Sequence, residues 1–183
     1  KKGFLEKIEL SNIVSVHDTS FVIVLPFLFA LSCKKNTKLF ACNLNASKNS
    51  ILNLGAFFEK NNQFTIISVP SVYRIILKLF SVKFRKNLER SNLISCGEPL
   101  DKILALEIIK NKPKSFFNLY GSTEVSPWII YLDVKKYLLS FVNQQKVPAV
   151  LPAGKPLPNV NILTSGEGEL LVNSKSQFSG YLN

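Results

Sequence analysis

The chain has 183 residues, of which 46% are hydrophobic and 19% are charged. This composition excludes a disordered, solvating chain, and the length is enough for one well-formed core but not for two large ones. Cys33, Cys42 and Cys96 lie far apart and outside any metal-ligand spacing, which excludes a disulfide scaffold and is typical of a protein of the reducing cytoplasm.

The first two thirds of the chain alternate short β-rich runs with amphipathic helical ones. Pro70 follows one predicted strand and suits the first turn of the helix after it, where a missing N–H costs nothing. Pro99 and Asp101 similarly open a later helix, in which we expect Leu100, Ile103, Leu104 and Ile108 to face the core. The predicted strands are 13–16, 38–41, 64–68, 92–96 and 115–120, and the predicted helices are 21–31, 50–60, 71–80 and 100–110.

This repetition predicts the α/β class, with a mainly parallel sheet flanked by helices on both faces. Beyond Trp128, prolines separate short strands, and we expect no helix there. The prediction is therefore an α/β subdomain over residues 1–127 and a β-rich, barrel-like subdomain over 128–183. The most apolar stretch, 21–33, is shorter than the roughly 20 residues of a bilayer span, so no membrane-spanning helix is expected.

The net charge of +11 would favour polyanionic partners, but the lysines are scattered between apolar segments. Such a distribution is typical of an ordinary solvated surface, and we expect no nucleic-acid partner. A basic binding module for nucleic acid or anionic membrane remains an alternative, although no recognition motif supports it.

Two polar turns follow predicted strands, at the edge of a parallel sheet where ligands bind. In the turn after 115–120, Tyr120 offers a flat face for a base and Gly121 permits close backbone approach. The hydroxyls of Ser122 and Thr123 can hold a phosphate oxygen, and Glu124 can bind a hard cation. These residue types suit a nucleotide with its metal, and they equally suit a plain polar turn.

The other turn, Gly97 to Pro99, is a weaker signal, since Gly-x-Pro is a common turn as well as a means of bringing backbone amides near a ligand. His17 is the only histidine and stands at the end of a predicted strand. A Ser-His-Asp hydrolase is disfavoured because no nucleophile elbow is present, which leaves a pocket residue or a core residue as readings of His17.

The seven residues from Asn118 to Glu124, NLYGSTE, resemble the NxYGxTE signature of the adenylate-forming, AMP-binding superfamily. Its members include acyl-CoA synthetases, luciferases and the adenylation domains of peptide synthetases. Four further segments match in the family's order: TIISVPSVYRIIL, SCGEPL, AGKPLPNV and GELLVNSKSQFSGYLN. The resemblance covers roughly Val14 to Asn183 and implies a fragment of the family's large N-terminal domain.

The resemblance implies a role for each matching position. Asn118 would contact the adenine amino group, Tyr120 would stack on the ring, and Gly97, Glu98 and Pro99 would wall it, mainly through their backbone. The catalytic positions would be Thr123, which would hold the α-phosphate, and Glu124, which would ligate magnesium. Gly121 and Ser122 would border the carboxylate of the substrate.

The implied activity is ATP-dependent activation of a carboxylic acid as its acyl-adenylate, with Mg²⁺ as cofactor and AMP as the bound product. Transfer to a thiol would follow, on CoA or on the phosphopantetheine of a carrier protein. His17 resembles a pocket position of acyl-activating members, whereas Asp18 and Ser20 resemble the FDxS element of amino-acid-activating members. An amino-acid adenylation domain and a non-catalytic adenylation-like domain are therefore the alternatives.

The sequence also departs from the family pattern. The phosphate-binding loop that should precede these segments, the later ribose-binding Asp and the C-terminal domain with its catalytic Lys have no counterpart in the 183 residues, and Cys96 replaces a usual Gly. We therefore expect the chain to be inactive by itself and to belong to a cytoplasmic ligase.

Overall fold

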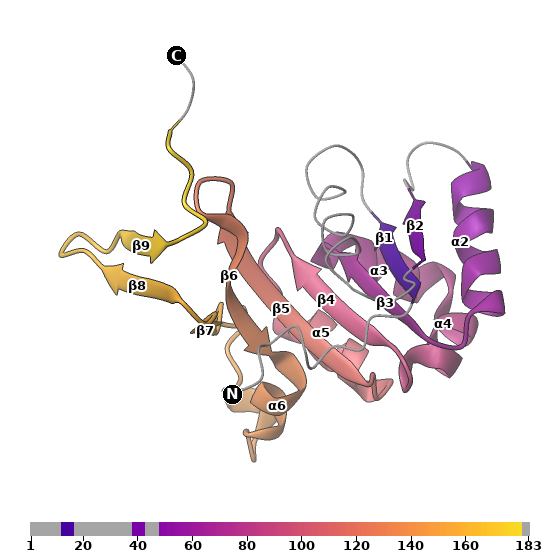
Figure 1. Cartoon of the computed structure of the whole chain (residues 1–183). Coiled ribbons are helices and arrows are strands. Elements are labelled where there is room, and N and C mark those ends of the chain that lie inside the picture. The colour runs from indigo at the N-terminus through magenta and orange to yellow at the C-terminus, as the bar shows by residue number, and fades with distance from the viewer. Residues whose placement is uncertain (1–11, 17–37, 43–47, 181–183) are drawn as a thin grey trace.

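The computed structural model describes residues 12–16, 38–42 and 48–180. Within these ranges, seven strands form one sheet in the order β2-β1-β3-β4-β5-β6-β7, and β8 and β9 form a separate two-stranded sheet (Figure 1). The strands are β1 (Asn12–Val16), β2 (Leu39–Cys42), β3 (Phe64–Ser68), β4 (Asn92–Cys96), β5 (Ser115–Ser122), β6 (Ser126–Asp133), β7 (Lys155–Pro156), β8 (Val160–Thr164) and β9 (Leu170–Ser174).

The first five strands pair in parallel, which confirms the predicted α/β class and the five predicted strands. The predicted helices after position 48 are also present, and Pro70 opens α3 as expected. The helix predicted over 21–31 lies outside the described residues. The helices are α2 (Lys48–Lys60), α3 (Pro70–Leu79), α4 (Ser81–Leu88), α5 (Lys102–Lys110) and α6 (Val134–Leu139), with a 3₁₀ turn, η2 (Gln144–Lys146).

Three details of the helix prediction are wrong. Helix α4 was not expected, and α6 lies in the part of the chain where no helix was expected. Asp133 explains the start of α6, because its side chain accepts a hydrogen bond from the Lys136 N–H at 3.0 Å and so caps the helix. In α5, Ile103 is 74% exposed, because the buried face runs through Leu104 and Ala105 instead.

All of these α-helices pack against the same face of the sheet, and buried residues from each of them share one hydrophobic cluster with that face. Phenylalanines form its densest part: the Phe58 ring lies 5.2 Å from the rings of both Phe64 and Phe84. The opposite face carries a second buried cluster that includes Ile13, Ile67 and Phe117. Coverage of that face by a helix remains a prediction.

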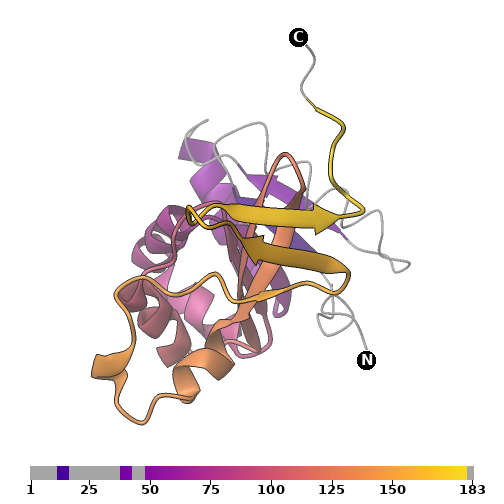
Figure 2. The same cartoon turned by 90° about the vertical axis from the view of Figure 1, so that its left-hand side faces the viewer.

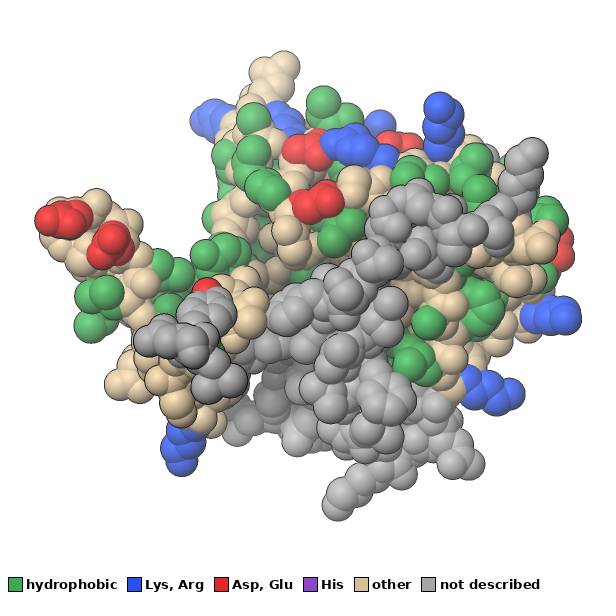
Figure 3. Space-filling view, turned by 90° about the horizontal axis from the view of Figure 1, so that it is seen from above, with side chains coloured by type: hydrophobic (Ala, Val, Ile, Leu, Met, Phe, Trp, Pro, Cys, Tyr) green, Lys and Arg blue, Asp and Glu red, His purple; other side chains and the backbone are tan. Residues whose placement is uncertain are grey.

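β6 continues the main sheet antiparallel to β5, and the predicted division between 127 and 128 falls inside it. The two-subdomain organisation therefore stays a prediction. Among the described residues, β8 and β9 form the only sheet that is separate from the main one. These two strands extend to the left in Figure 1, away from α2, α3 and α4, and Figure 2 shows them from that side, in front of the main sheet. The tip of this hairpin is acidic (Figure 3), since Glu167 and Glu169 stand in the turn between β8 and β9.

The segment 147–154 returns across the start of α5 before the chain enters β7. Its backbone is held there, because the Leu151 N–H donates to the Leu100 carbonyl and the Lys102 N–H donates to the Ala149 carbonyl, both at 2.9 Å. Gly154 then passes directly over β6, where a Cβ would lie 2.1 Å from the Tyr131 carbonyl oxygen. Its φ of +113° also belongs to the region that favours glycine.

We expect Gly154→Ala to lower the free energy of unfolding by about 2 kcal/mol or more, because the new methyl group must displace backbone of β6. Denaturant unfolding measures this. Gly166→Ala is the matched control, since nothing lies within 4 Å of a Cβ at that position. Equal stability of the two variants would contradict the close approach.

The Asp101 carboxyl group makes the stability of the fold depend on pH. Burial raises the pKa of this carboxyl group, but the hydrogen bond from the Leu104 N–H and the pairing with Arg74 outweigh burial and bring the pKa below its ordinary value of 3.8. The folded state therefore favours the ionised form, so its contribution to stability is present above the unfolded pKa and is lost as pH falls through the folded pKa.

The unfolding free energy of the natural chain should accordingly exceed that of Asp101→Asn at pH 6, and the difference should shrink on titration below pH 4. Asn keeps the cap and removes only the charge. Arg74→Gln should reduce the same pH-dependent difference. A difference that stays constant down to pH 2 would contradict the assignment.

Candidate functional site

A cavity of about 270 Å³ opens where β4 and β5 end. The two strands run parallel in register, with Ser95 opposite Asn118 and Cys96 opposite Leu119, so the turns that follow them meet at one edge. Six of the residues predicted to bind a nucleotide line this cavity: Gly97, Glu98, Pro99, Asn118, Tyr120 and Gly121. Two motifs that are about 20 residues apart in the sequence are thus brought together.

Asn118 contributes a buried polar group to the cavity. The residue is only 6% exposed, and its Oδ1 has no hydrogen-bond partner among the described residues. A buried acceptor without a donor costs free energy in the folded state.

Tyr120 stands between this cavity and a second one of about 430 Å³. It is 45% exposed, and the pairing of β5 with β6 shifts register between Tyr120 and Ser122. Ser122 and Glu124 line the second cavity together with residues of β9, and Thr123 is exposed in the turn between them. The Glu124 carbonyl accepts a hydrogen bond of 2.9 Å from the Phe178 N–H, which ties this turn to the segment after β9.

The turn after β4 depends on glycine. Gly97 has a φ of +80°, and a Cβ there would lie 3.2 Å from a methyl group of Val69. The carboxylate of the next residue, Glu98, binds another part of the chain: it accepts hydrogen bonds from the N–H and the hydroxyl of Ser71, at 2.9 and 2.7 Å.

Cys96, which precedes Gly97, is buried on the face of the sheet opposite the helices. Burial raises the pKa of its thiol to about 11, against a smaller lowering by a hydrogen bond with Trp128. The thiol is therefore protonated at neutral pH and is not available as a nucleophile.

The far wall of the first cavity consists of residues that were not predicted from the sequence. Val150, Leu151 and Ala153, from the segment that returns over α5, complete it, and Val150 is 54% exposed there. No local pattern marks them, because they reach the site through pairing with Leu100 and Asp101. His17 and Asp18, predicted for a substrate pocket, lie outside the described residues.

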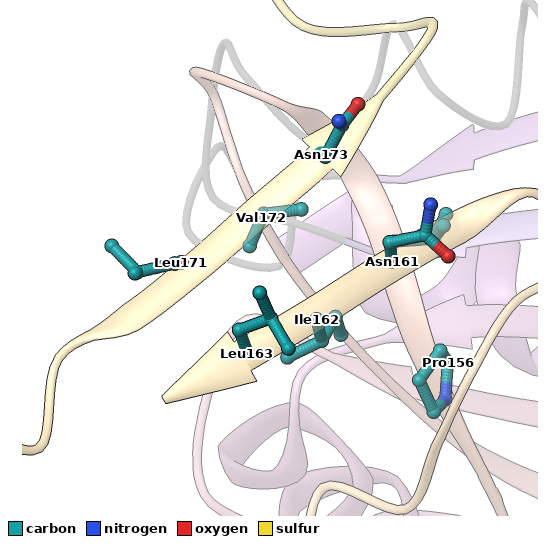
Figure 4. Close-up of a pocket in the computed structure, with 8 residues that line it drawn as sticks. Pro156, Asn161, Ile162, Leu163, Leu171, Val172 and Asn173 are labelled. Carbon is teal, nitrogen blue, oxygen red and sulfur yellow. The ribbon is translucent and has the colours of Figure 1, made fainter. Parts of the chain in front are cut away.

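The other features of the described residues do not add to this site. The described residues contain no group of three or more His, Cys, Asp and Glu side chains that could hold a metal ion. They also contain no helix long and apolar enough to cross a membrane. A cavity beneath β8 and β9, with Pro156 beside it, offers only two asparagine amides among apolar side chains (Figure 4).

Known proteins resemble this chain in sequence. The D-alanine–D-alanyl carrier protein ligase of Staphylococcus epidermidis is 26% identical over 117 residues, which are 63% of this chain and 23% of that protein. The ligase of the same name from Staphylococcus haemolyticus is 26% identical over 118 residues. The matched segment thus spans less than a quarter of the length of these relatives.

Solved structures share the fold. The N-terminal subdomain of Klebsiella oxytoca NpsA, in complex with 3-hydroxyanthranilyl-AMSN, gives a TM-score of 0.72 at 17% identity and covers 96% of this chain and 45% of that one. The Vibrio cholerae adenylation domain AlmE, in complex with glycyl-adenosine-5′-phosphate, gives 0.67 at 19% identity, with 95% and 34% covered. Residues 6–182 match the family described as AMP-binding enzyme, and the chain therefore belongs to that family.

Proposed function

We propose that this chain supplies the adenine-binding part of an enzyme that activates a carboxylic acid as its acyl-adenylate. The observation that carries the proposal is the cavity lined by Asn118, Tyr120 and the turn Gly97 to Pro99, in which the buried Oδ1 of Asn118 has no hydrogen-bond partner among the described residues. The 6-amino group of adenine is a donor of the right kind for this acceptor. The exposed Tyr120 ring is available to stack on the base.

In this proposal the bound base directs the phosphates toward the turn that holds Thr123 and Glu124. The Thr123 hydroxyl would donate to an α-phosphate oxygen, and Glu124 would hold Mg²⁺. Mg²⁺ is commonly bound through one or two carboxylates plus substrate phosphates, so a single glutamate fits it. When bound, the metal neutralises charge on the phosphates.

The first step forms a bond between a carboxylate oxygen of the acid and the α-phosphorus of ATP, and pyrophosphate leaves with the electrons of the broken bond. In the second step a thiol attacks the acyl carbon, loses its proton, and AMP leaves. The chain's own residues contribute mainly by positioning the reactants and stabilising charge. The names of the sequence relatives favour a carrier-protein thiol over CoA as acceptor, and an amino acid as the acid.

The role of Asn118 can be tested because a binding role and a structural role predict opposite effects. Asn118→Leu should weaken ATP binding by about tenfold or more while leaving the melting temperature unchanged or higher, since it removes a buried acceptor to which no described residue donates. Calorimetric titration and thermal unfolding of the complete protein measure both. A lower melting temperature with unaltered ATP affinity would show that the amide serves the fold instead.

Glu124 is tested in the exchange reaction. In the complete protein, Glu124→Ala should reduce acid-dependent ATP–pyrophosphate exchange by about a hundredfold or more, because the metal loses its protein ligand. Glu167→Ala is the control, since it removes an exposed carboxylate from the β8–β9 turn. The acids to be compared include D-alanine, glycine and an aryl acid. Exchange that survives in Glu124→Ala would remove the metal role from this residue.

A further inference from the structure

The Glu98 side chain binds the first turn of helix α3, a contact that the proposed function does not require. Helix α3 begins at Pro70, and the residue before it, Val69, has no side chain that can cap a helix. Pro70 has no N–H, and the N–H groups of Val72 and Tyr73 both donate to the Val69 carbonyl. The Ser71 N–H is left, and its acceptor is the Glu98 carboxylate, 27 residues further along the chain.

The interaction is bidentate. One carboxylate oxygen of Glu98 accepts from the Ser71 N–H at 2.9 Å, and the other accepts from the Ser71 hydroxyl at 2.7 Å. A negative charge at the start of a helix is also favoured by the helix dipole. Glu98 is therefore the N-terminal cap of a helix to which it does not belong.

A second polar contact between α3 and this loop lies about one helical turn further along α3. Arg74 of α3 pairs with Asp101, so residues 71 and 74 of one helix hold residues 98 and 101 of the loop between β4 and α5. Gly97 adds a close backbone approach to Val69. The loop that forms one wall of the proposed adenine cavity is thus fastened to α3 at both of its ends.

We propose that Glu98 is a positioning residue: by binding Ser71 it fixes the loop Gly97 to Pro99 in the shape that receives the nucleotide, without touching the nucleotide through its carboxylate. The identity of the ligand in this proposal rests on the proposed function. The attachment of the loop to α3 through Glu98 and Ser71 does not depend on it. A loop with glycine at φ +80° has other conformations available. Release of the carboxylate should therefore loosen the wall and lower affinity without removing any ligand contact.

The test compares Glu98→Ala, Glu98→Gln, Ser71→Ala and the double variant Glu98→Ala/Ser71→Ala in the complete protein, with Glu89→Ala as the control at an exposed glutamate. Hydrogen exchange without nucleotide is the first readout. Glu98→Ala should speed exchange of the Ser71 N–H by about tenfold, on the scale of a lost cap. Glu98→Gln should restore most of the protection, because its amide oxygen still accepts from that N–H.

ATP affinity is the second readout. Glu98→Ala should weaken it by about five- to tenfold, Ser71→Ala by less, and the double variant by no more than Glu98→Ala alone, since the two residues act as one unit. Additive losses would overturn the proposal, because they would mean that Glu98 contacts the nucleotide directly. Unaltered Ser71 exchange in Glu98→Ala would also overturn it. Absence of ATP binding in the natural protein would instead refute the proposed function, and the exchange measurement would still decide the fastening.

Discussion

The parallel pairing of β4 with β5 is the constraint on which the site depends. Ser95 to Cys96 lie in register with Asn118 to Leu119, so both strands end at the same edge of the sheet. The turns that follow can therefore share one cavity, as turns at the carboxyl ends of parallel strands do in other α/β proteins. A slip of one residue in β5 would reverse which face Asn118 occupies and would take its amide out of the cavity.

The site concentrates features that cost stability. Asn118 buries an acceptor without a partner among the described residues, Gly97 has a positive φ, and Tyr120 is 45% exposed. The surrounding structure compensates with contacts of another kind: the backbone bonds of segment 147–154 to α5, and the two pairs that join α3 to the loop after β4. Such a division is expected where a rigid frame supports groups that await a ligand.

Local patterns were enough to predict the five parallel strands and the helices α2, α3 and α5, because runs such as FTIIS and NLISC are apolar, β-branched and bounded by turn residues. The antiparallel strand β6 was not predicted. Local patterns did not predict the features that depend on packing or on a single capping residue. Ile103 fits a helical apolar pattern but faces solvent, and α6 is only six residues long, so its start depends on the Asp133 cap rather than on periodicity. The motif residues of the site could be found from sequence. Val150, Leu151 and the Glu98–Ser71 bond could not, since they come from contacts between distant segments.

The most direct measurement is a crystal structure of the complete protein with a non-hydrolysable ATP analogue and magnesium. We expect the adenine ring to lie between Tyr120 and the loop Gly97 to Pro99, with its amino group within hydrogen-bond distance of Asn118 Oδ1. A base bound elsewhere, or one whose amino group turns away from Asn118 toward solvent, would contradict the assignment of this cavity.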